Sequence, residues 1–256
     1  MKIAIDRMNL LRPLGHVSSV VERRNTIPIL ANIVLRAESS KLSLTATDMD
    51  MDIMTELDCS VIQEGSCTVP AHLLNDIIRK LPDGSEVSIH VSDGNAQISA
   101  GRSSFKVPTL PVDDFPAFNT SDLPVKFILT TADLRHQIDM TRFAISTEET
   151  RYYLNGIYFH KSDSGALAAV ATDGHRLALA GIDMPQGAET MPEIILPRKA
   201  VGELRKLLDD AEGEMHVSLS ETRAEFAFGS ARLTSKLIDG SFPDYTRVIP
   251  EGNDKI

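Results

Sequence analysis

The sequence predicts an α+β protein made of two tandem copies of one domain, each with antiparallel sheets covered by two helices. One observation behind this prediction is a repeat of three landmarks, in the same order, about 125 residues apart. The pairs are Leu44–Asp48 with Ala169–Asp173, Val69–Leu74 with Leu196–Val201, and Asp114–Pro116 with Ser241–Pro243. The other is that segments with strand character outnumber helical ones and follow one another directly, which favours antiparallel pairing.

The first copy, residues 1–116, should hold two helices among short strands. Apolar residues at helical spacing, such as Leu74, Ile77 and Ile78, predict helices at 7–24 and 71–81. Pro13 should kink the first helix or move its start later. The turn sequence Asp93-Gly-Asn predicts a hairpin. The expected strands are 2–5, 32–37, 42–47, 51–61, a short one ending at Val69, 87–91, 96–100 and 105–107.

The second copy, residues 126–244, repeats this order. Residues 117–125 contain Asn, Thr, Ser and Asp without periodicity and are interpreted as a linker. Helices are expected at 131–145 and at 198–208, the latter from the spacing of Val201, Leu204 and Leu208. The expected strands are 126–129, 156–160, 166–171, 176–182, 194–196, 215–219, 224–228 and 232–236.

Length and composition favour a cytoplasmic protein without a membrane partner. The chain has 256 residues, 42% of them hydrophobic, which is enough for two ordinary cores. Its apolar stretches are shorter than the ~18 residues of a membrane helix, and Met1–Asp6 lacks the apolar region of a signal peptide. Cys59 and Cys67 lack the further cysteines or nearby histidines of a zinc site, so reduced, packed thiols are expected. We predict no cofactor and no metal.

Charge is distributed unevenly along the chain. The formal net charge is −10, which by itself argues against binding nucleic acid. The four predicted helices nevertheless carry 12 of the 26 Lys and Arg residues and only 5 of the 36 Asp and Glu residues. A positive face among acidic surroundings would attract phosphates along one approach only. The alternative is that Lys and Arg are simply favourable on helix surfaces.

Two polar motifs invite a site interpretation. The segment Thr47–Asp52 alternates acids with methionine, but Ile53 and Cys59 stand where a calcium loop needs glycine and glutamate. A strand with one solvated acidic face and one buried methionine face is favoured instead. In Ala171–Leu177, Asp173 and His175 are separated by one glycine and lack a nucleophile or third ligand, which favours a turn capped by Asp173.

The tyrosines Tyr152 and Tyr153 lie beside Arg151, between a predicted helix and strand. Successive residues of a strand point to opposite faces, so one of the two rings should be exposed. An exposed ring near basic helices could stack on a nucleobase or be an ordinary surface residue.

Several motifs together resemble the bacterial DNA polymerase III β subunit family, the sliding clamps. They are Arg151–Gly156, Ala171–Leu177, Leu196–Lys199, Thr234–Gly240 and Phe242–Val248, with Arg102–Phe105 and Asp114–Pro116 in the first copy. The resemblance implies two tandem DNA-clamp domains in a non-enzymatic processivity factor. Two protomers with three such domains each would form a ring, with helices lining a central hole around duplex DNA and sheets forming the outer wall.

The resemblance also implies which residues bind partners. Sequence-independent contacts to double-stranded DNA are expected from Arg24, Arg79, Lys80, Arg142, Arg151, Tyr152, Tyr153, Arg198, Lys199, Arg205 and Lys206. A cleft for linear-motif peptides is expected from Leu154, Thr172, Gly174, His175, Arg176, Leu177, Pro243, Arg247 and Val248. Its ligands would be the DNA polymerase III alpha subunit, the clamp loader and other proteins with a clamp-binding motif. Phe105 and Val107 would lie at the dimer interface.

Residues 245–256 are interpreted as the lead-in to a missing third clamp domain. A homodimer is expected when that domain is present, and a protein ending at Ile256 is expected not to close the ring. Two alternatives stay open from the residues themselves. One is a small-molecule hydrolase using Asp173 and His175, and the other is an acidic scaffold protein with no role on DNA, in which the basic helices would not share a face.

Overall fold

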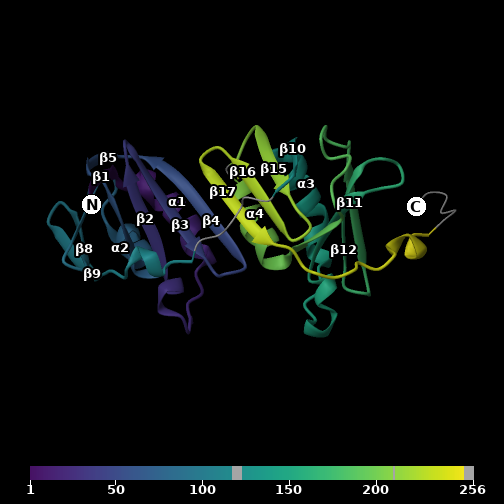
Figure 1. Ribbon diagram of the computed structural model, residues 1–256, viewed down its shortest axis with the longest axis horizontal. Coiled ribbons are helices and arrows are strands. Elements are labelled where there is room, and N and C mark those ends of the chain that lie inside the picture. The colour runs from purple at the N-terminus through teal and green to yellow at the C-terminus, as the bar shows by residue number, and fades with distance from the viewer. Residues whose placement is uncertain (117–122, 210, 251–256) are drawn as a thin grey trace.

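The computed structural model describes residues 1–116, 123–209 and 211–250 of the chain (Figure 1). The molecule is elongated, with the N-terminal half at one end, the C-terminal half at the other and a broad sheet between them. Within the described residues, no helix is both long enough and apolar enough to cross a membrane. Residues 117–122 of the expected linker and residues 251–256 of the expected lead-in to a third domain lie outside the described residues.

The N-terminal half follows the predicted order of elements. Its helices are α1 (Arg7–Val20) and α2 (Ala71–Lys80), with short 3₁₀ turns at Pro28–Ala31 and Val112–Asp114. Its strands are β1 (Lys2–Asp6), β2 (Asn32–Glu38), β3 (Lys41–Thr47), β4 (Met51–Asp58), β5 (Ser60–Gln63), β6 (Gly65–Pro70), β7 (Glu86–Ser92), β8 (Asn95–Ala100) and β9 (Ser103–Pro108).

The C-terminal half repeats this order. Its helices are α3 (Thr131–Thr141) and α4 (Arg198–Leu208), with 3₁₀ turns at Arg142–Ala144, Glu149–Leu154 and Tyr245–Val248. Its strands are β10 (Val125–Thr130), β11 (Gly156–Lys161), β12 (Leu167–Thr172), β13 (Leu177–Ile182), β14 (Ile194–Pro197), β15 (Glu214–Leu219), β16 (Arg223–Phe228) and β17 (Ala231–Lys236).

One sheet runs through both halves of the molecule. Its strand order is β10-β15-β16-β17-β4-β3-β2-β6. Each half contributes four strands to this eight-stranded antiparallel sheet. The join is the pairing of β17 with β4, in which Thr234 lies opposite Asp52 and Leu233 opposite Ile53. A smaller sheet closes each end, β5-β1-β7-β8-β9 in the first half and β13-β12-β11-β14 in the second. The predicted antiparallel sheets are confirmed, whereas the shared sheet was not predicted.

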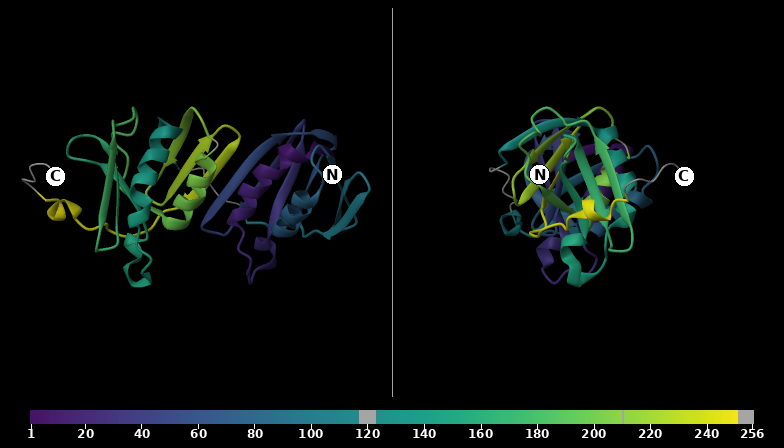
Figure 2. Two further views of the ribbon diagram at one scale, coloured as in Figure 1. Left: turned by 180° about the vertical axis from the view of Figure 1, so that it is seen from behind. Right: turned by 90° about the vertical axis from the view of Figure 1, so that its right-hand side faces the viewer.

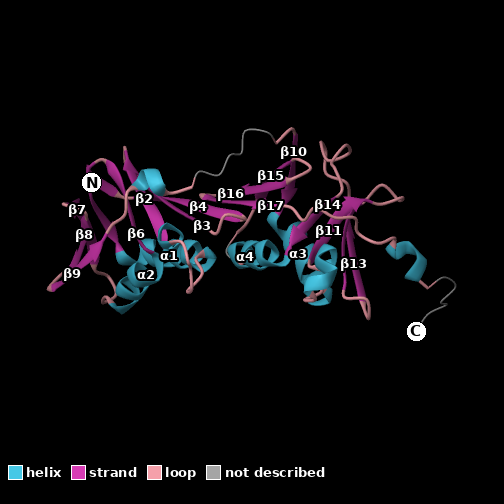
Figure 3. Ribbon diagram, turned by 60° about the horizontal axis from the view of Figure 1, so that its bottom comes forward, coloured by secondary structure: helices cyan, strands magenta, loops and turns pink. Residues whose placement is uncertain are grey.

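The four helices lie in a row along one side of the molecule, in the order α2, α1, α4, α3 (Figure 3). Neighbours in the row are in contact, and the view from behind shows the same row (Figure 2). Each helix buries an apolar stripe against the sheets, as Leu14 of α1 and Leu204 of α4 illustrate. The side of the row that faces away from the sheets is called the helix face below.

Three predicted elements end earlier than expected. The helix expected at 7–24 ends at Val20, and it begins at Arg7 despite Pro13, because the Asp6 carboxylate accepts a hydrogen bond from the Met8 amide at 2.7 Å. The helix expected at 131–145 ends at Thr141 and continues as a 3₁₀ turn. The strand expected at 51–61 breaks at Cys59, where the chain leaves the shared sheet and β5 pairs with β1 instead.

The acidic segment Thr47–Asp52 is not the solvated strand face that its alternation suggested. Asp48, Met49 and Asp50 form the turn between β3 and β4, with Met49 at a positive φ of 79° and 45% exposed. Asp52 lies in β4 between Thr47 of β3 and Thr234 of β17, and is only 8% exposed. Alternation was misleading because β4 is not open to water along its length: β17 of the other half pairs with it, and Val112, Phe115 and Pro116 line the same pocket as Asp52.

Candidate functional site

The basic residues of the helix face fall into two groups. Among the predicted DNA contacts, four exposed side chains make no ion pair with any described residue, and they are Arg24, Arg79, Lys80 and Arg198. Arg24 lies beyond the end of α1, Arg79 and Lys80 close the last turn of α2, and Arg198 opens α4. These guanidinium and ammonium groups are the positive charges most available to an external phosphate.

The other predicted DNA contacts are held by acids of the chain itself. Lys199 lies 2.5 Å from the Asp48 carboxylate and 3.0 Å from that of Glu22. The remaining pairs are Arg205 with Asp139 (2.7 Å) and Asp209, Arg142 with Asp139 (3.3 Å), Lys206 with Glu203 (2.7 Å) and Arg151 with Glu148 (2.8 Å). An ion pair offsets part of the positive charge that a phosphate would meet.

Three of these acids also connect the halves of the molecule on the helix side. Glu203 of α4 accepts a hydrogen bond from the Ser19 hydroxyl of α1 and is 7% exposed. Lys199 of α4 reaches Glu22 and Asp48 of the first half. Together with the pairing of β17 with β4, these contacts fix the orientation of α1 relative to α4.

The sequence suggested that the two adjacent tyrosines lie on a strand, but the structure places them elsewhere. They belong to the 3₁₀ turn Glu149–Leu154, which is interrupted by non-helical backbone at Arg151. The ring of Tyr152 is 53% exposed and meets that of Tyr153 edge to face at 5.7 Å between centroids. Gly240 packs against both, since a Cβ there would lie 3.0 Å from the Tyr153 Cβ. The prediction that one ring is exposed is confirmed, although for another reason.

The turn between β12 and β13 is built by its own side chains. Asp173 Oδ1 accepts hydrogen bonds from the amides of His175 and Arg176, both at 3.0 Å, and Oδ2 accepts one from Arg176 Nε at 3.0 Å. These hydrogen bonds lower the pKa of Asp173 to about 2, with the two backbone amides contributing most. The predicted capping role of Asp173 is confirmed, and both carboxylate oxygens are engaged in it.

The outer face of the sheet β13-β12-β11-β14, turned away from α3, is called the cleft face. Strand alternation places on it Tyr158, Val170, Thr172, Leu177 and Leu179, with Thr172 directly opposite Leu177. The intervening residues, such as Ala169 and Ala178, are buried in the core.

The segment after β17 lies on this cleft face. Phe242 stacks on Tyr158 with 4.7 Å between ring centroids, and the Tyr245 hydroxyl is 3.0 Å from His160 Nε2. The structure therefore brings Pro243 to the same face as Thr172 and Leu177.

The other predicted cleft residues are placed less uniformly. Gly174, His175 and Arg176 form the turn at the end of the cleft face, whereas Leu154 is buried. Arg247 and Val248 lie in the exposed 3₁₀ turn beyond Tyr245, where Arg247 pairs with Asp244 at 2.8 Å.

The sequence analysis missed two exposed apolar side chains near the cleft face. Leu179 is 46% exposed, and strand alternation from Leu177 could have identified it. Phe143 is 55% exposed, and the Arg176 guanidinium lies over its ring at 5.7 Å from the centroid. No local pattern indicated Phe143. The helix predicted to contain it ends at Thr141, and the ring contacts Arg176, which belongs to the distant β12–β13 turn.

The strand β9 is an edge of the five-stranded sheet, as expected for the segment with Phe105 and Val107. Phe105 is 38% exposed, so its side chain is available to a neighbouring molecule. Val107 is 1% exposed and packs inward, which leaves only its backbone for pairing across the edge.

Comparison with known proteins identifies the family. Residues 1–119 match the N-terminal domain, and residues 128–244 the central domain, of the DNA polymerase III beta subunit. The chain belongs to the DNA polymerase III beta subunit family. The beta sliding clamps of Caulobacter vibrioides and Pseudomonas aeruginosa are 52% and 40% identical to it, and the matches cover the whole chain and 70% of each relative.

Solved sliding clamps share the fold. A Bartonella birtlesii clamp crystallised with griselimycin is 49% identical and superposes with a TM-score of 0.97 over 99% of this chain and 69% of that one. The Caulobacter crescentus clamp is 52% identical with a TM-score of 0.94, covering 100% of this chain and 70% of that one. The predicted fold class and family are confirmed.

Membership of this family decides between the functions left open by the sequence. Sliding clamps are non-catalytic processivity factors of DNA polymerase III, so this chain is not a hydrolase. The geometry agrees, because Asp173 is committed to its turn. The acidic scaffold without a DNA role predicted that the basic helices would not share a face. They do share one (Figure 3).

Proposed function

We propose that this sliding clamp meets duplex DNA with its helix face and partner proteins with its cleft face. The observation that carries the proposal is that two different surfaces serve two kinds of contact. The helix face carries cations that pair with no described residue, and the cleft face carries apolar side chains, of which Leu179 is exposed, beside the aromatic segment after β17. Members of the family act in DNA replication by encircling DNA and tethering the polymerase.

On the DNA side, we assign the leading phosphate contacts to Arg24, Arg79, Lys80 and Arg198. Their charges are exposed and unpaired among the described residues. The predicted contacts Arg142, Arg151, Lys199, Arg205 and Lys206 already face carboxylates, so a smaller share of DNA affinity is assigned to them. Tyr152 is the tyrosine with an exposed ring. Contacts of this kind reach phosphates and bases without reading sequence, so binding should be sequence-independent and strongly dependent on salt.

On the partner side, we assign linear-motif binding to Thr172, Leu177 and Pro243, with His175 and Arg176 at the rim. Leu179 and Phe143 add exposed apolar surface next to them. Apolar anchors edged by a few polar groups are what a short peptide requires. Sliding clamps of Bartonella birtlesii and Pseudomonas aeruginosa have been crystallised with griselimycin. For this chain we propose peptides of the DNA polymerase III alpha subunit, the clamp loader and other clamp-binding proteins as ligands.

The assembly that follows is a homodimeric ring closed with a third domain. We propose that the exposed edge of β9, with the Phe105 side chain, contributes to the protomer contact. We also propose domain boundaries at 1–116 and 126–244, which divide the strands of the shared sheet equally. Because replication takes place on the bacterial chromosome, we infer a cytoplasmic location.

A peptide titration tests the cleft assignment. A fluorescent peptide carrying a clamp-binding motif of the polymerase alpha subunit is titrated with the protein and with Leu177→Ala, and anisotropy gives the Kd. We expect Leu177→Ala to raise the Kd about tenfold, because a central apolar anchor contributes more than about 1 kcal/mol. Ile62→Ala is the matched control, since Ile62 is an apolar residue of β5 and 59% exposed. Equal affinity for the two variants would contradict the cleft assignment.

A further inference from the structure

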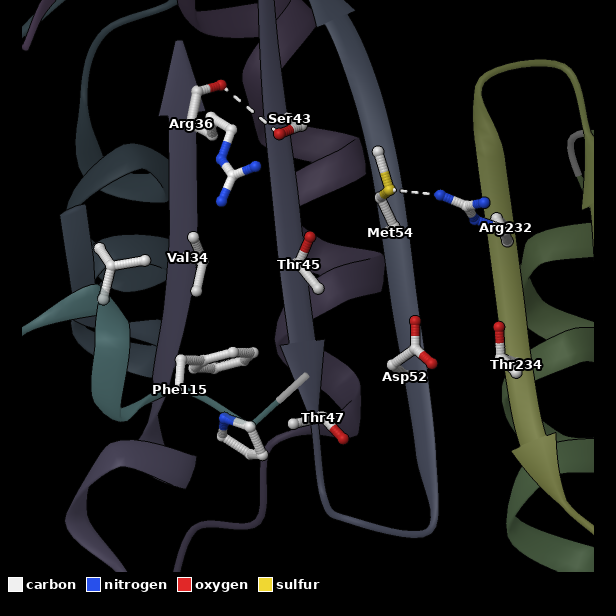
Figure 4. A pocket seen from close by; sticks show the side chains of 12 residues that line it. Val34, Arg36, Ser43, Thr45, Thr47, Asp52, Met54, Phe115, Arg232 and Thr234 are labelled. Carbon is white, nitrogen blue, oxygen red and sulfur yellow. Dashed lines mark hydrogen bonds between the residues drawn. The ribbon is translucent and has the colours of Figure 1, made fainter. Parts of the chain in front are cut away.

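A second concave site lies on the shared sheet, on the side turned away from the helices. It is a cavity of about 300 Å³ beside the pairing of β4 with β17, and we call it the seam pocket (Figure 4). The residues that line it include Asp52 and Thr234, Met54 and Phe115, and the two arginines Arg36 and Arg232. The helix face and the cleft face use none of these residues.

Asp52 is the unusual group in the seam pocket. The residue is 8% exposed, and its Oδ1 atom makes no hydrogen bond to any described residue. The hydroxyl of Thr234, which is fully buried beside it, has no hydrogen-bond geometry to any described residue, although it lies close enough to lower the pKa of Asp52. A buried carboxyl group without a partner costs free energy that a bound hydrogen-bond donor would recover.

The nearest cation of the chain does not supply that donor. The Arg232 guanidinium contacts the Met54 sulfur at 2.9 Å and lies 3.8 Å from the Glu225 carboxylate, while no ion pair joins it to Asp52 within the described residues. Figure 4 shows the Asp52 carboxyl beside Thr234 rather than directed at Arg232. Asp52 thus lines the pocket without an ion pair to any described residue.

The opposite end of the seam pocket carries a positive charge. Arg36 is exposed, and its guanidinium makes no ion pair with any described residue. In Figure 4 its side chain extends along β2 toward Val34 and Thr45, into the space above the strands. Between this end and Asp52, Figure 4 shows Thr45, with the apolar side chains of Val34 and Phe115 on one side and Met54 on the other. The pocket thus presents an anion site, an apolar span and a cation site in sequence.

We propose that the seam pocket binds small amphipathic zwitterions, which carry an amine or amidine at one end and a carboxylate at the other. Asp52 would receive the cationic end and Arg36 the anionic end, while an apolar body lies against Met54 and Phe115. A volume of about 300 Å³ is at the lower limit of ligand sites and suits a single ring with two short substituents. Such a ligand would touch both halves of the molecule.

The proposal has a consequence for pH. Burial raises the pKa of Asp52 to about 7, against the opposing charge of Arg232 and the neighbouring Thr234 hydroxyl. Glu225 from β16 raises it further, Arg223 from β16 lowers it, and Arg36 faces it from the far end of the pocket. A cation binds the ionised carboxylate, so affinity should increase about tenfold between pH 6 and pH 8 as that form becomes dominant.

The test uses 4-(aminomethyl)benzoate as the probe, with calorimetry for affinity and backbone amide chemical shifts for location. We expect one bound molecule, shifts concentrated at residues 45–54 and 232–234, and tighter binding at pH 8 than at pH 6. Benzylamine and 4-methylbenzoate each lack one charge and should bind at least fivefold more weakly. If benzylamine bound as tightly as the probe, or if shifts appeared elsewhere only, the proposal would be overturned.

Variants separate the two ends of the seam pocket. Asp52→Asn should weaken probe binding at least tenfold at pH 8 and remove the pH dependence, whereas Arg36→Gln should weaken it several-fold and retain the pH dependence. Asp58→Asn is the matched control, because Asp58 is an exposed carboxylate on the same strand. Unchanged binding by Asp52→Asn would overturn the proposal. If that variant does not fold, the pH profile of the unmodified protein and the benzylamine comparison decide the question.

Discussion

The Lys199 ammonium group at the start of α4 lies 2.5 Å from the Asp48 carboxylate in the β3–β4 turn, and so joins the two halves of the clamp. Asp48 Oδ1 accepts hydrogen bonds from the amides of Asp50 and Met51 at 2.9 and 2.8 Å. In the second copy, Asp173 Oδ1 accepts hydrogen bonds from the amides at the same two positions of its turn. The copies differ in the other oxygen. Asp48 Oδ2 meets Lys199, whereas Asp173 Oδ2 meets Arg176 of its own turn. One repeated turn thus serves an interdomain contact in the first copy and shapes the cleft face in the second.

Replacing Lys199 should destabilise the protein. Lys199→Met leaves the Asp48 side chain, which is 8% exposed, without its cation, and we expect a loss of about 1–3 kcal/mol in the free energy of unfolding. Urea denaturation measures it. Lys80→Met serves as control, since Lys80 is exposed and makes no ion pair with any described residue. Equal stability of the two variants would show that the Lys199 contact contributes nothing.

Asp52→Asn should stabilise the protein in neutral and alkaline solution. The pKa of Asp52 is raised from 3.8 to about 7 in the folded state, so the folded protein holds a proton that the unfolded chain releases. The stability from this proton is fully present below pH 3.8 and is lost as the pH rises through about 7. At pH 8 the variant should therefore be more stable by up to about 4 kcal/mol, and its stability should vary less between pH 4 and 7. Thermal unfolding across pH, with Asp58→Asn as reference, measures both effects.

Two glycines should respond to alanine in opposite directions. Gly202 lies inside α4 with open space around its Cα, so Gly202→Ala should raise stability by about 0.5–1 kcal/mol. A Cβ at Gly156 would collide with the Leu196 carbonyl oxygen and lie 2.9 Å from the Ile195 Cγ2. Gly156→Ala should lower the melting temperature because β11 and β14 would have to separate. A result of the same sign for both variants would contradict this account.

The salt dependence of DNA binding should distinguish unpaired from paired arginines. Arg24→Ala and Arg198→Ala should each reduce the slope of log K against log salt by about one, since each removes one phosphate contact. Arg205→Ala should change the slope less, because its guanidinium is held by Asp139 and Asp209. Anisotropy with a labelled duplex at several salt concentrations provides the measurement. A larger effect for Arg205 would reverse the proposed ranking.

Local patterns predicted most elements to within a few residues, because strand alternation and helical spacing depend only on neighbours in sequence. The helix at 198–208 was predicted at the observed bounds, and the turn at Asp173 was assigned its capping role. Predictions failed where distant segments intervene. Asp52 lies opposite Thr234 of β17, a strand from the other half, and is 8% exposed. Tyr152 and Tyr153 follow a 3₁₀ turn against Gly240 rather than a strand.

The sequence by itself determined the duplicated α+β fold, the basic character of the helices and the family motifs, since each is a repeated or contiguous pattern. Only the tertiary structure decided which positive charges are available to DNA. Lys199, for example, pairs with Glu22 and Asp48, and both acids lie far from it in the sequence. It also decided that β17 pairs with β4 and places Thr234 against Asp52. The physical reason is that the backbone groups at a sheet edge can form hydrogen bonds with almost any strand. Which strand pairs there is therefore decided by how the side chains of the whole molecule pack.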